Sequence, residues 1–144
     1  MLGMKTYSHE YIDGCRSNLE ADLAAYRGMV AARGSSSVNE TPRHSVFDAF
    51  EAVFFNNMVI VLDSLFVHRL RVIEGKDGNA LNEVRMLCAS LMEHAGVMTL
   101  DKSIKWSPAK SVLKYQDGDE IKLSEADFAL LSQAFFTEIE RKYL

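Results

Sequence analysis

The sequence predicts an all-α protein: a four-helix bundle around one long central helix, with a small β-hairpin before the last helix. The stretch from Phe47 to Ile73 contains no Gly or Pro and is apolar on nearly every face, which is typical of a helix inside a core. Three further segments repeat apolar residues at three- and four-residue spacing. Alternating residues on both sides of Asp117-Gly118 indicate the hairpin.

The first helix is expected over residues 8–33, with Ser8 as its N-cap and Gly34 as its C-terminal stop. Its apolar positions are Tyr11, Ile12, Cys15, Leu19, Leu23, Tyr26 and Val30. Gly14 and Gly28 interrupt this pattern, and a glycine costs about 1 kcal/mol relative to alanine inside a helix. They indicate either a close approach by a neighbouring helix or a helix that frays.

A Ser-rich linker over residues 34–41 is expected to form a loop before the central helix. That helix begins either at Thr41, followed by Pro42, or at Ser45. Charged side chains recur along it, so it does not contain the uncharged run of about 18 residues that a membrane span needs. We therefore expect a central core helix and no membrane partner.

Gly75 is expected to end the central helix, and either Asp77 or Asn79 caps the next one, which stops near Gly96. The hairpin arms are predicted at residues 111–115 and 120–123. Ser124 and Asp127 form a capping-box pattern that opens the last helix. Its predicted buried positions are Phe128, Leu131, Phe135, Ile139 and Tyr143.

Composition places the chain among ordinary globular proteins, with 144 residues in one domain (1–144), 48% hydrophobic and 25% charged. The net charge of −4 argues against a nucleic-acid partner. Cys15 and Cys88 fall inside helical patterns and are expected to be reduced core thiols. The N-terminus lacks the apolar region of a signal peptide, so a cytoplasmic location is expected.

No metal site or cofactor is predicted. His9, His44, His68 and His94 are scattered, and no two have the spacing that places both ligands on one helix face. The sequence also lacks the glycine-rich phosphate-binding motif and the nucleophile-elbow motif.

Two polar residues of the central helix, Asn56 and Asp63, are seven positions apart and lie among apolar neighbours. A carboxylate in such a place needs hydrogen bonds or a cation, because burying an unpaired charge is costly. We interpret both residues as members of a buried structural network.

The candidate ligand site is a dense group of polar residues around the turn after the central helix. Its members are His68, Arg69, Arg71, Asn82, Glu83 and Arg85. Two interpretations remain open. The residues form internal ion pairs, such as Glu83 with Arg71, or they line a polar binding site.

A helical hairpin with polar residues around its turn resembles the HEPN family of small, dimeric all-α domains. That resemblance covers residues 45–95 and implies an alternative function: a nucleotide-binding or RNA-processing enzyme that uses Arg85 and His68. The family's usual signature is an Arg followed four to six residues later by a His. This chain departs from it, because the first His after Arg85 is His94.

The favoured interpretation is a non-enzymatic, cytoplasmic binding or assembly module that forms a homodimer. The chain has more large aromatic residues than three companion helices are expected to cover, and such apolar surplus is rarely left exposed on a monomer. These residues are Phe47, Phe50, Phe54, Phe55, Phe66, Phe128, Phe135 and Phe136.

Overall fold

The computed structural model describes residues 3–34 and 41–144, and the side chains of residues 3–32 and 46–144. Most of the expected Ser-rich loop, the side chains of the two expected cap residues Thr41 and Ser45, and His44 therefore lie outside the described part.

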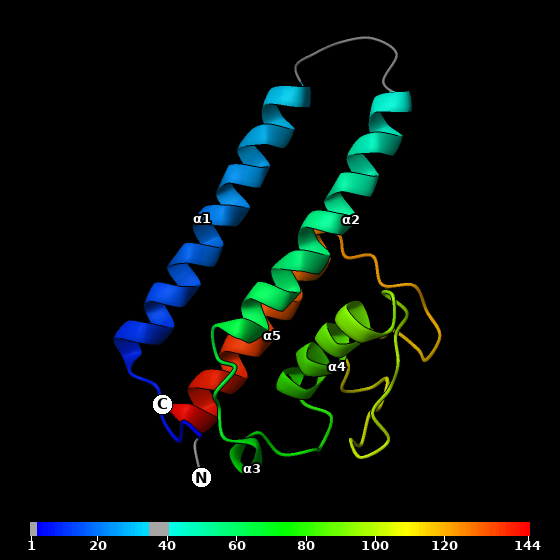
Figure 1. Cartoon of the computed structure of the whole chain (residues 1–144). Coiled ribbons are helices and arrows are strands. Elements are labelled where there is room, and N and C mark those ends of the chain that lie inside the picture. Colours follow the sequence, from blue (N-terminus) through cyan, green and yellow to red (C-terminus); the bar gives the residue numbers. More distant parts are fainter. Residues whose placement is uncertain (1–2, 35–40) are drawn as a thin grey trace.

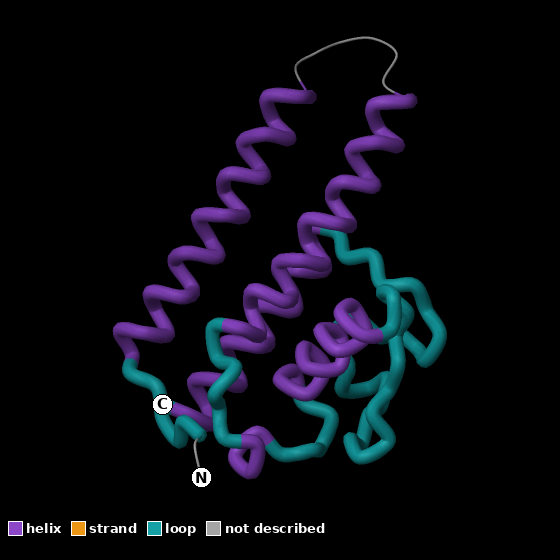
Figure 2. Tube along the Cα trace, in the orientation of Figure 1, coloured by secondary structure: helices purple, strands orange, loops and turns teal. Residues whose placement is uncertain are grey.

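The described chain is mostly helical, which confirms the all-α class. Its helices are α1 (His9–Gly34), α2 (Thr41–Ser64), α3 (Arg71–Glu74), α4 (Ala80–Glu93) and α5 (Glu125–Tyr143). Four of them are long and α3 is a single turn (Figure 1). No residue of the described ranges belongs to a strand (Figure 2). Within the same ranges, no helix is long and apolar enough to cross a bilayer.

Helices α1 and α2 run antiparallel. Near one end the Tyr11 hydroxyl donates a hydrogen bond to the Leu65 carbonyl, and toward the other the rings of Tyr26 and Phe54 stack at 5.6 Å. Figure 1 shows both helices extending as an arm beyond the body formed with α4 and α5.

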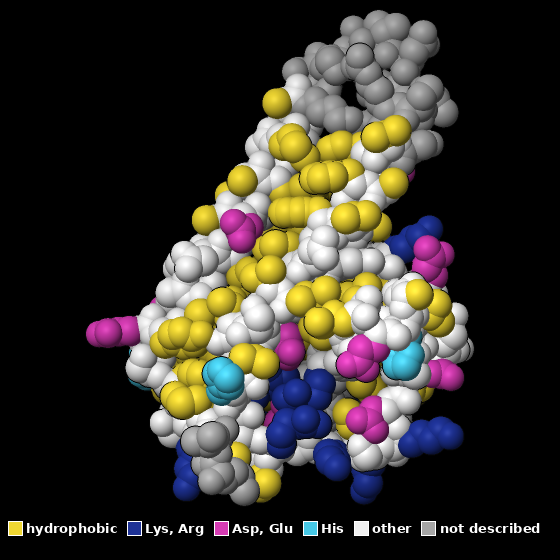
Figure 3. All heavy atoms as spheres, in the orientation of Figure 1, with side chains coloured by type: hydrophobic (Ala, Val, Ile, Leu, Met, Phe, Trp, Pro, Cys, Tyr) yellow, Lys and Arg dark blue, Asp and Glu magenta, His cyan; other side chains and the backbone are white. Residues whose placement is uncertain are grey.

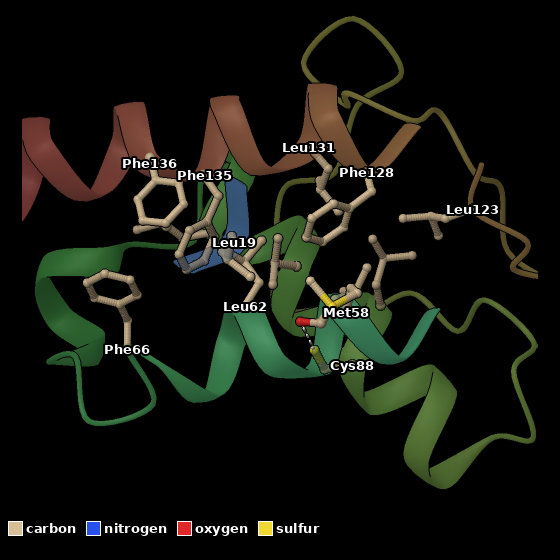
Figure 4. Close-up of a cluster of buried hydrophobic side chains, with 14 of the residues drawn as sticks. Leu19, Met58, Leu62, Phe66, Cys88, Leu123, Phe128, Leu131, Phe135 and Phe136 are labelled. Atoms are coloured by element: carbon tan, nitrogen blue, oxygen red, sulfur yellow. Dashed lines mark hydrogen bonds between the residues drawn. The ribbon is translucent and has the colours of Figure 1, made fainter. Parts of the chain in front are cut away.

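Helix α5 packs against each of the other four helices. All five apolar positions predicted for it, residues 128, 131, 135, 139 and 143, are fully buried. Figure 4 shows Phe128 and Phe135 pointing into the cluster with Met58, Leu62 and Leu19. The predicted capping box is present, since Ser124 and Asp127 exchange two hydrogen bonds of 3.1 Å. Helix α5 therefore holds the core together.

The prediction of one helix from Phe47 to Ile73 is wrong in its last third, because α2 ends at Ser64. Residues 65–68 form a turn, and the extended N-terminal segment around Met4 pairs with the residues that follow this turn. Met4 donates to the His68 carbonyl (2.7 Å) and accepts from the Leu70 amide (2.9 Å). These contacts replace helical hydrogen bonds, and no residue of the local sequence is a helix breaker.

The predicted β-hairpin is also absent from the described residues. The turn at Asp117-Gly118 forms, with Gly118 at a φ of 94°, but its two arms do not pair with each other. Gly118 and Ile121 donate instead to the carbonyls of Met98 and Gly96, at 2.8 and 2.9 Å. The segment before the turn is held elsewhere, by the carboxylate of Glu83.

Gly14 and Gly28 do not mark a close helix approach. A Cβ atom at either position would meet nothing within 4 Å outside the local helix backbone. The interpretation of these glycines as contact points is therefore wrong.

Candidate functional site

The polar residues around the turn after α2 do come together, and Glu74 lies at their centre. Its Oε1 accepts hydrogen bonds from Arg69 Nε (2.7 Å) and Arg85 Nη2 (2.6 Å). Its Oε2 accepts from Asn82 Nδ2 (2.8 Å) and Arg85 Nε (3.1 Å). One buried carboxylate thus links α3 to two positions of α4 and to the chain just after α2.

Arg69 is the most deeply buried cation of this network, with no exposed side-chain surface. Besides Glu74, it donates to the carbonyls of Phe66 (3.0 Å) and Leu81 (3.4 Å). Asp63 Oδ1 lies 2.9 Å from Arg69 Nη2 but accepts no hydrogen bond from it, so this contact is an ion pair without a hydrogen bond. Arg69 also lies over the ring of Phe135 at 5.5 Å.

The charges of this network fix the protonation state of Glu74. Burial alone would raise the pKa of its carboxyl, but the hydrogen bond from Arg85 and the charges of both arginines outweigh burial. The pKa of Glu74 is therefore below its ordinary value. Burial likewise disfavours charged Arg85, yet its bonds with Glu74 raise the pKa of the guanidinium overall. Both groups are ionised at neutral pH.

Glu83 is buried, but the ion pair with Arg71 that one interpretation of the sequence predicts does not form. Its carboxylate accepts from the Ser111 hydroxyl (3.1 Å) and from the amides of Val112 (2.8 Å) and Leu113 (2.9 Å). Three neutral donors therefore satisfy the charge and fasten the loop onto α4. The Glu83 carboxylate is therefore part of the structure and is not available to a ligand.

Asn82 and Asn79 organise the turn between α3 and α4. The Asn79 side chain accepts from the amides of Leu81 and Asn82, so it is the N-cap of α4. Asn82 Oδ1 accepts from the Gly78 amide at 3.0 Å, and its amide group donates to the Gly75 carbonyl at 2.9 Å. The side chains of both asparagines therefore form hydrogen bonds within the protein.

Asn56 and Asp63 are half-buried and have separate partners. Asn56 donates to the Ile121 carbonyl (2.9 Å) and accepts from the Leu123 amide (3.1 Å), which anchors the chain before α5. Asp63 lies against Arg69, as described above.

The remaining members of the predicted site line two different cavities. Arg71 and Arg85 line one of about 370 Å³, together with His94, Asp101 and residues of the following loop; we name it the Arg71 cavity. His68 lines another, of about 550 Å³, with Met4, Tyr7 and Tyr11; we name it the His68 cavity.

Sequence reasoning missed His94 and Asp101 as neighbours of the arginines. His94 is the C-cap residue of α4, so the helix that carries Arg85 also brings His94 to this cavity. Asp101 lies in the irregular chain that follows, and no spacing pattern in the sequence links it to residues 71 and 85.

The two cysteines are both free and buried. Cys88 donates to the Val59 carbonyl at 3.4 Å (Figure 4), and burial raises the pKa of its thiol. Among the described residues, no three His, Cys, Asp or Glu side chains are grouped so that they could hold a metal ion.

No protein-family model matches this chain, and neither curated protein sequences nor solved structures give a significant match. Function must therefore be argued from the residues themselves.

Proposed function

We propose that this protein is a non-enzymatic, cytoplasmic binding or assembly module: a four-helix bundle that forms a homodimer through the exposed face of α2. The observation that carries the proposal is a row of four exposed apolar side chains, which we name the α2 row. Its members are Val46, Phe50, Val53 and Val61, whose exposed fractions are 71%, 48%, 59% and 41%.

Val46, Phe50 and Val53 are four and three residues apart, which makes them neighbours on the helix surface. Val61, eight residues after Val53, falls on the same side about two turns further along. The row is about 22 Å long at 1.5 Å per residue. Figure 3 shows hydrophobic side chains along the arm that α1 and α2 form. The exposed side chain of Asn57 lies on the same side between Val53 and Val61, so the apolar surface is continuous over Val46, Phe50 and Val53 and resumes at Val61. Exposed apolar side chains gathered on one face are typical of an interaction site.

A second copy of the chain is the partner that fits this face best. Between Val46 and Ser64 no charged residue of α2 falls on the same side as the row. Glu120 and Lys122, which line a cavity with Val53, are an ion pair of opposite charges. A face without a net charge can meet its own copy about a two-fold axis without a net repulsion. Association would cover four side chains that water otherwise surrounds.

Most of the aromatic residues that first suggested a dimer do not contribute to this face. Phe55, Phe66, Phe128, Phe135 and Phe136 are buried within one chain. Phe47 and Phe54 are partly buried against the same core, which leaves Phe50 as the exposed member of that set. The support for a dimer now comes from three valines and one phenylalanine.

The alternative, a HEPN-like nucleotide-binding or RNA-processing enzyme, requires Arg85 and His68 in one site. These residues line separate cavities, Arg85 in the Arg71 cavity and His68 in the His68 cavity. The geometry therefore favours the binding module.

Sedimentation velocity of matched variants tests the proposal. We expect wild type at micromolar concentration to have twice the single-chain mass of 16.2 kDa. Val53→Lys should have the single-chain mass, because a lysine in the interface would lose its hydration without gaining a partner. Val72→Lys is the control, since Val72 lies on α3 and is 80% exposed. A wild type with the mass of one chain, or a dimeric Val53→Lys variant, would contradict the proposal.

A further inference from the structure

Three basic side chains line the Arg71 cavity: Arg71 comes from α3, and Arg85 and His94 come from α4 and its C-cap. Figure 3 shows Lys and Arg side chains gathered between two histidines at the lower end of the visible face. Basic groups that converge on one concavity are the usual recognition elements for anions.

The guanidinium group of Arg85 is hydrogen-bonded along one edge and open along the other. Its Nε and Nη2 groups donate to the buried Glu74 carboxylate, whereas Nη1 donates to no residue in the described ranges. About a fifth (21%) of the side chain is exposed. Because Glu74 fixes the guanidinium beforehand, a ligand that accepts from the open edge restricts little further motion.

Arg71 is exposed, and its side chain has no hydrogen bond or ion pair with any described residue. The acidic residue of the cavity, Asp101, has internal donors. Its Oδ1 accepts from the Ser103 amide (2.9 Å) and from the Ser103 hydroxyl (2.7 Å). The charge of Arg71 acts on Asp101 across the cavity, but among the described residues no carboxylate contacts Arg71 directly.

The rest of the wall comes from Thr99 and from four apolar residues, Met86, Ala89, Leu100 and Ile104. Met86 and Ile104 are buried, so they form a firm surface against which the organic part of a ligand can pack. The cavity volume of about 370 Å³ lies in the range of small-molecule sites.

We propose that the Arg71 cavity binds a small phosphate monoester, with its phosphate between Arg71, Arg85 and His94 and its organic group on the Met86 side. A phosphate dianion matches two guanidinium groups and an imidazole better than a carboxylate does, because it has more charge and three terminal oxygens. This ligand site goes beyond the proposed dimer, since none of its residues belongs to the α2 row.

Calorimetric titration with phenyl phosphate at fixed ionic strength tests the site. We expect binding to wild type, and a roughly tenfold or greater loss of affinity in Arg71→Ala, which removes one charge-assisted contact. Arg71 is exposed and has no hydrogen bond or ion pair with any described residue, so this variant should fold normally. Arg141→Ala is the matched control: it removes an exposed arginine that pairs with Glu138, outside this cavity, and should leave affinity unchanged.

Two further readouts make the result specific. Benzoate should bind more weakly than phenyl phosphate, and the Arg85 Nε–H resonance should shift on titration with phenyl phosphate. Undetectable binding at millimolar phenyl phosphate, equal affinity for benzoate, or wild-type affinity in Arg71→Ala would each overturn the proposal.

Discussion

Arg69 and Glu74 are five residues apart, and their side chains form a 2.7 Å ion pair of which at most 1% is exposed. Arg69 lies in the break between α2 and α3 and Glu74 lies in α3, in a region where the sequence alone predicts a continuous helix. Each charge of this pair stabilises the other, because burying either charge without its partner would strongly lower the stability of the fold. The pair thereby fixes the direction in which the chain leaves α2.

Replacement of Glu74 should be among the most destabilising single changes in the chain. We expect Glu74→Gln to lower the free energy of unfolding by about 3–5 kcal/mol, because it removes the carboxylate that is hydrogen-bonded to buried Arg69 and leaves only the Coulombic contact with Asp63. Urea denaturation measures the effect. Glu138→Gln removes the carboxylate of a surface pair with Arg141 and should cost at most about 1 kcal/mol. Equal midpoints for the two variants would contradict this account of the network.

The lowered pKa of Glu74 predicts a specific acid sensitivity. Because the pKa is lower in the folded than in the unfolded state, the stabilisation is fully present above the ordinary value of 4.5 and is lost as pH falls through the folded-state pKa. Urea midpoints measured from pH 6 downward should therefore fall less steeply below about pH 4.5 in Glu74→Gln than in wild type. Parallel curves for the two proteins would refute the assignment.

Two glycine substitutions should have opposite effects. Gly78 has a φ of 85°, and a Cβ atom there would lie 2.3 Å from the Lys105 carbonyl oxygen, so Gly78→Ala should cost more than about 2 kcal/mol. Gly28 is exposed inside α1 with open space around it, so Gly28→Ala should stabilise by roughly 0.5–1 kcal/mol. Thermal melts compare the two, and a shift of the same sign in both would count against the fold.

Replacement of Glu83 should destabilise the loop between α4 and α5 more than it destabilises the rest of the molecule. Glu83→Gln replaces one acceptor oxygen with a donor, so at least one of the three loop donors loses its partner, at a cost of about 1–3 kcal/mol. Hydrogen exchange should become faster at the amides of Val112 and Leu113 than at those of α5. Glu93→Gln, an exposed change at the end of α4, is the control and should leave these rates unchanged. Faster exchange of Val112 and Leu113 in Glu93→Gln, or unchanged exchange in Glu83→Gln, would contradict the role of Glu83.

Helix boundaries set by local chemistry could be predicted from the sequence. The box of Ser124 and Asp127, the Asn79 cap and the buried stripe of α5 all depend on residues within one or two helical turns. Ser8 likewise accepts from the Tyr11 amide at the start of α1.

Features that depend on distant partners could not be predicted. The break after Ser64 depends on Met4, more than 60 positions away in the chain, and the failed hairpin depends on the pairing of Gly118 and Ile121 with the chain after α4. The candidate site was divided because the central helix ends earlier than predicted. The expected turn between two helices grouped His68 with Arg85, whereas in the fold His68 lines one cavity and Arg85 lines another with His94.

The most direct test of the proposed dimer is an isotope-filtered nuclear Overhauser experiment on a mixture of valine-methyl-labelled and unlabelled chains. The proposal predicts intermolecular signals at the methyl groups of Val53 and Val61, which belong to the α2 row, and none at Val72 on α3. A mixed sample with no intermolecular signal at Val53 or Val61, or with signals only at Val72, would contradict it.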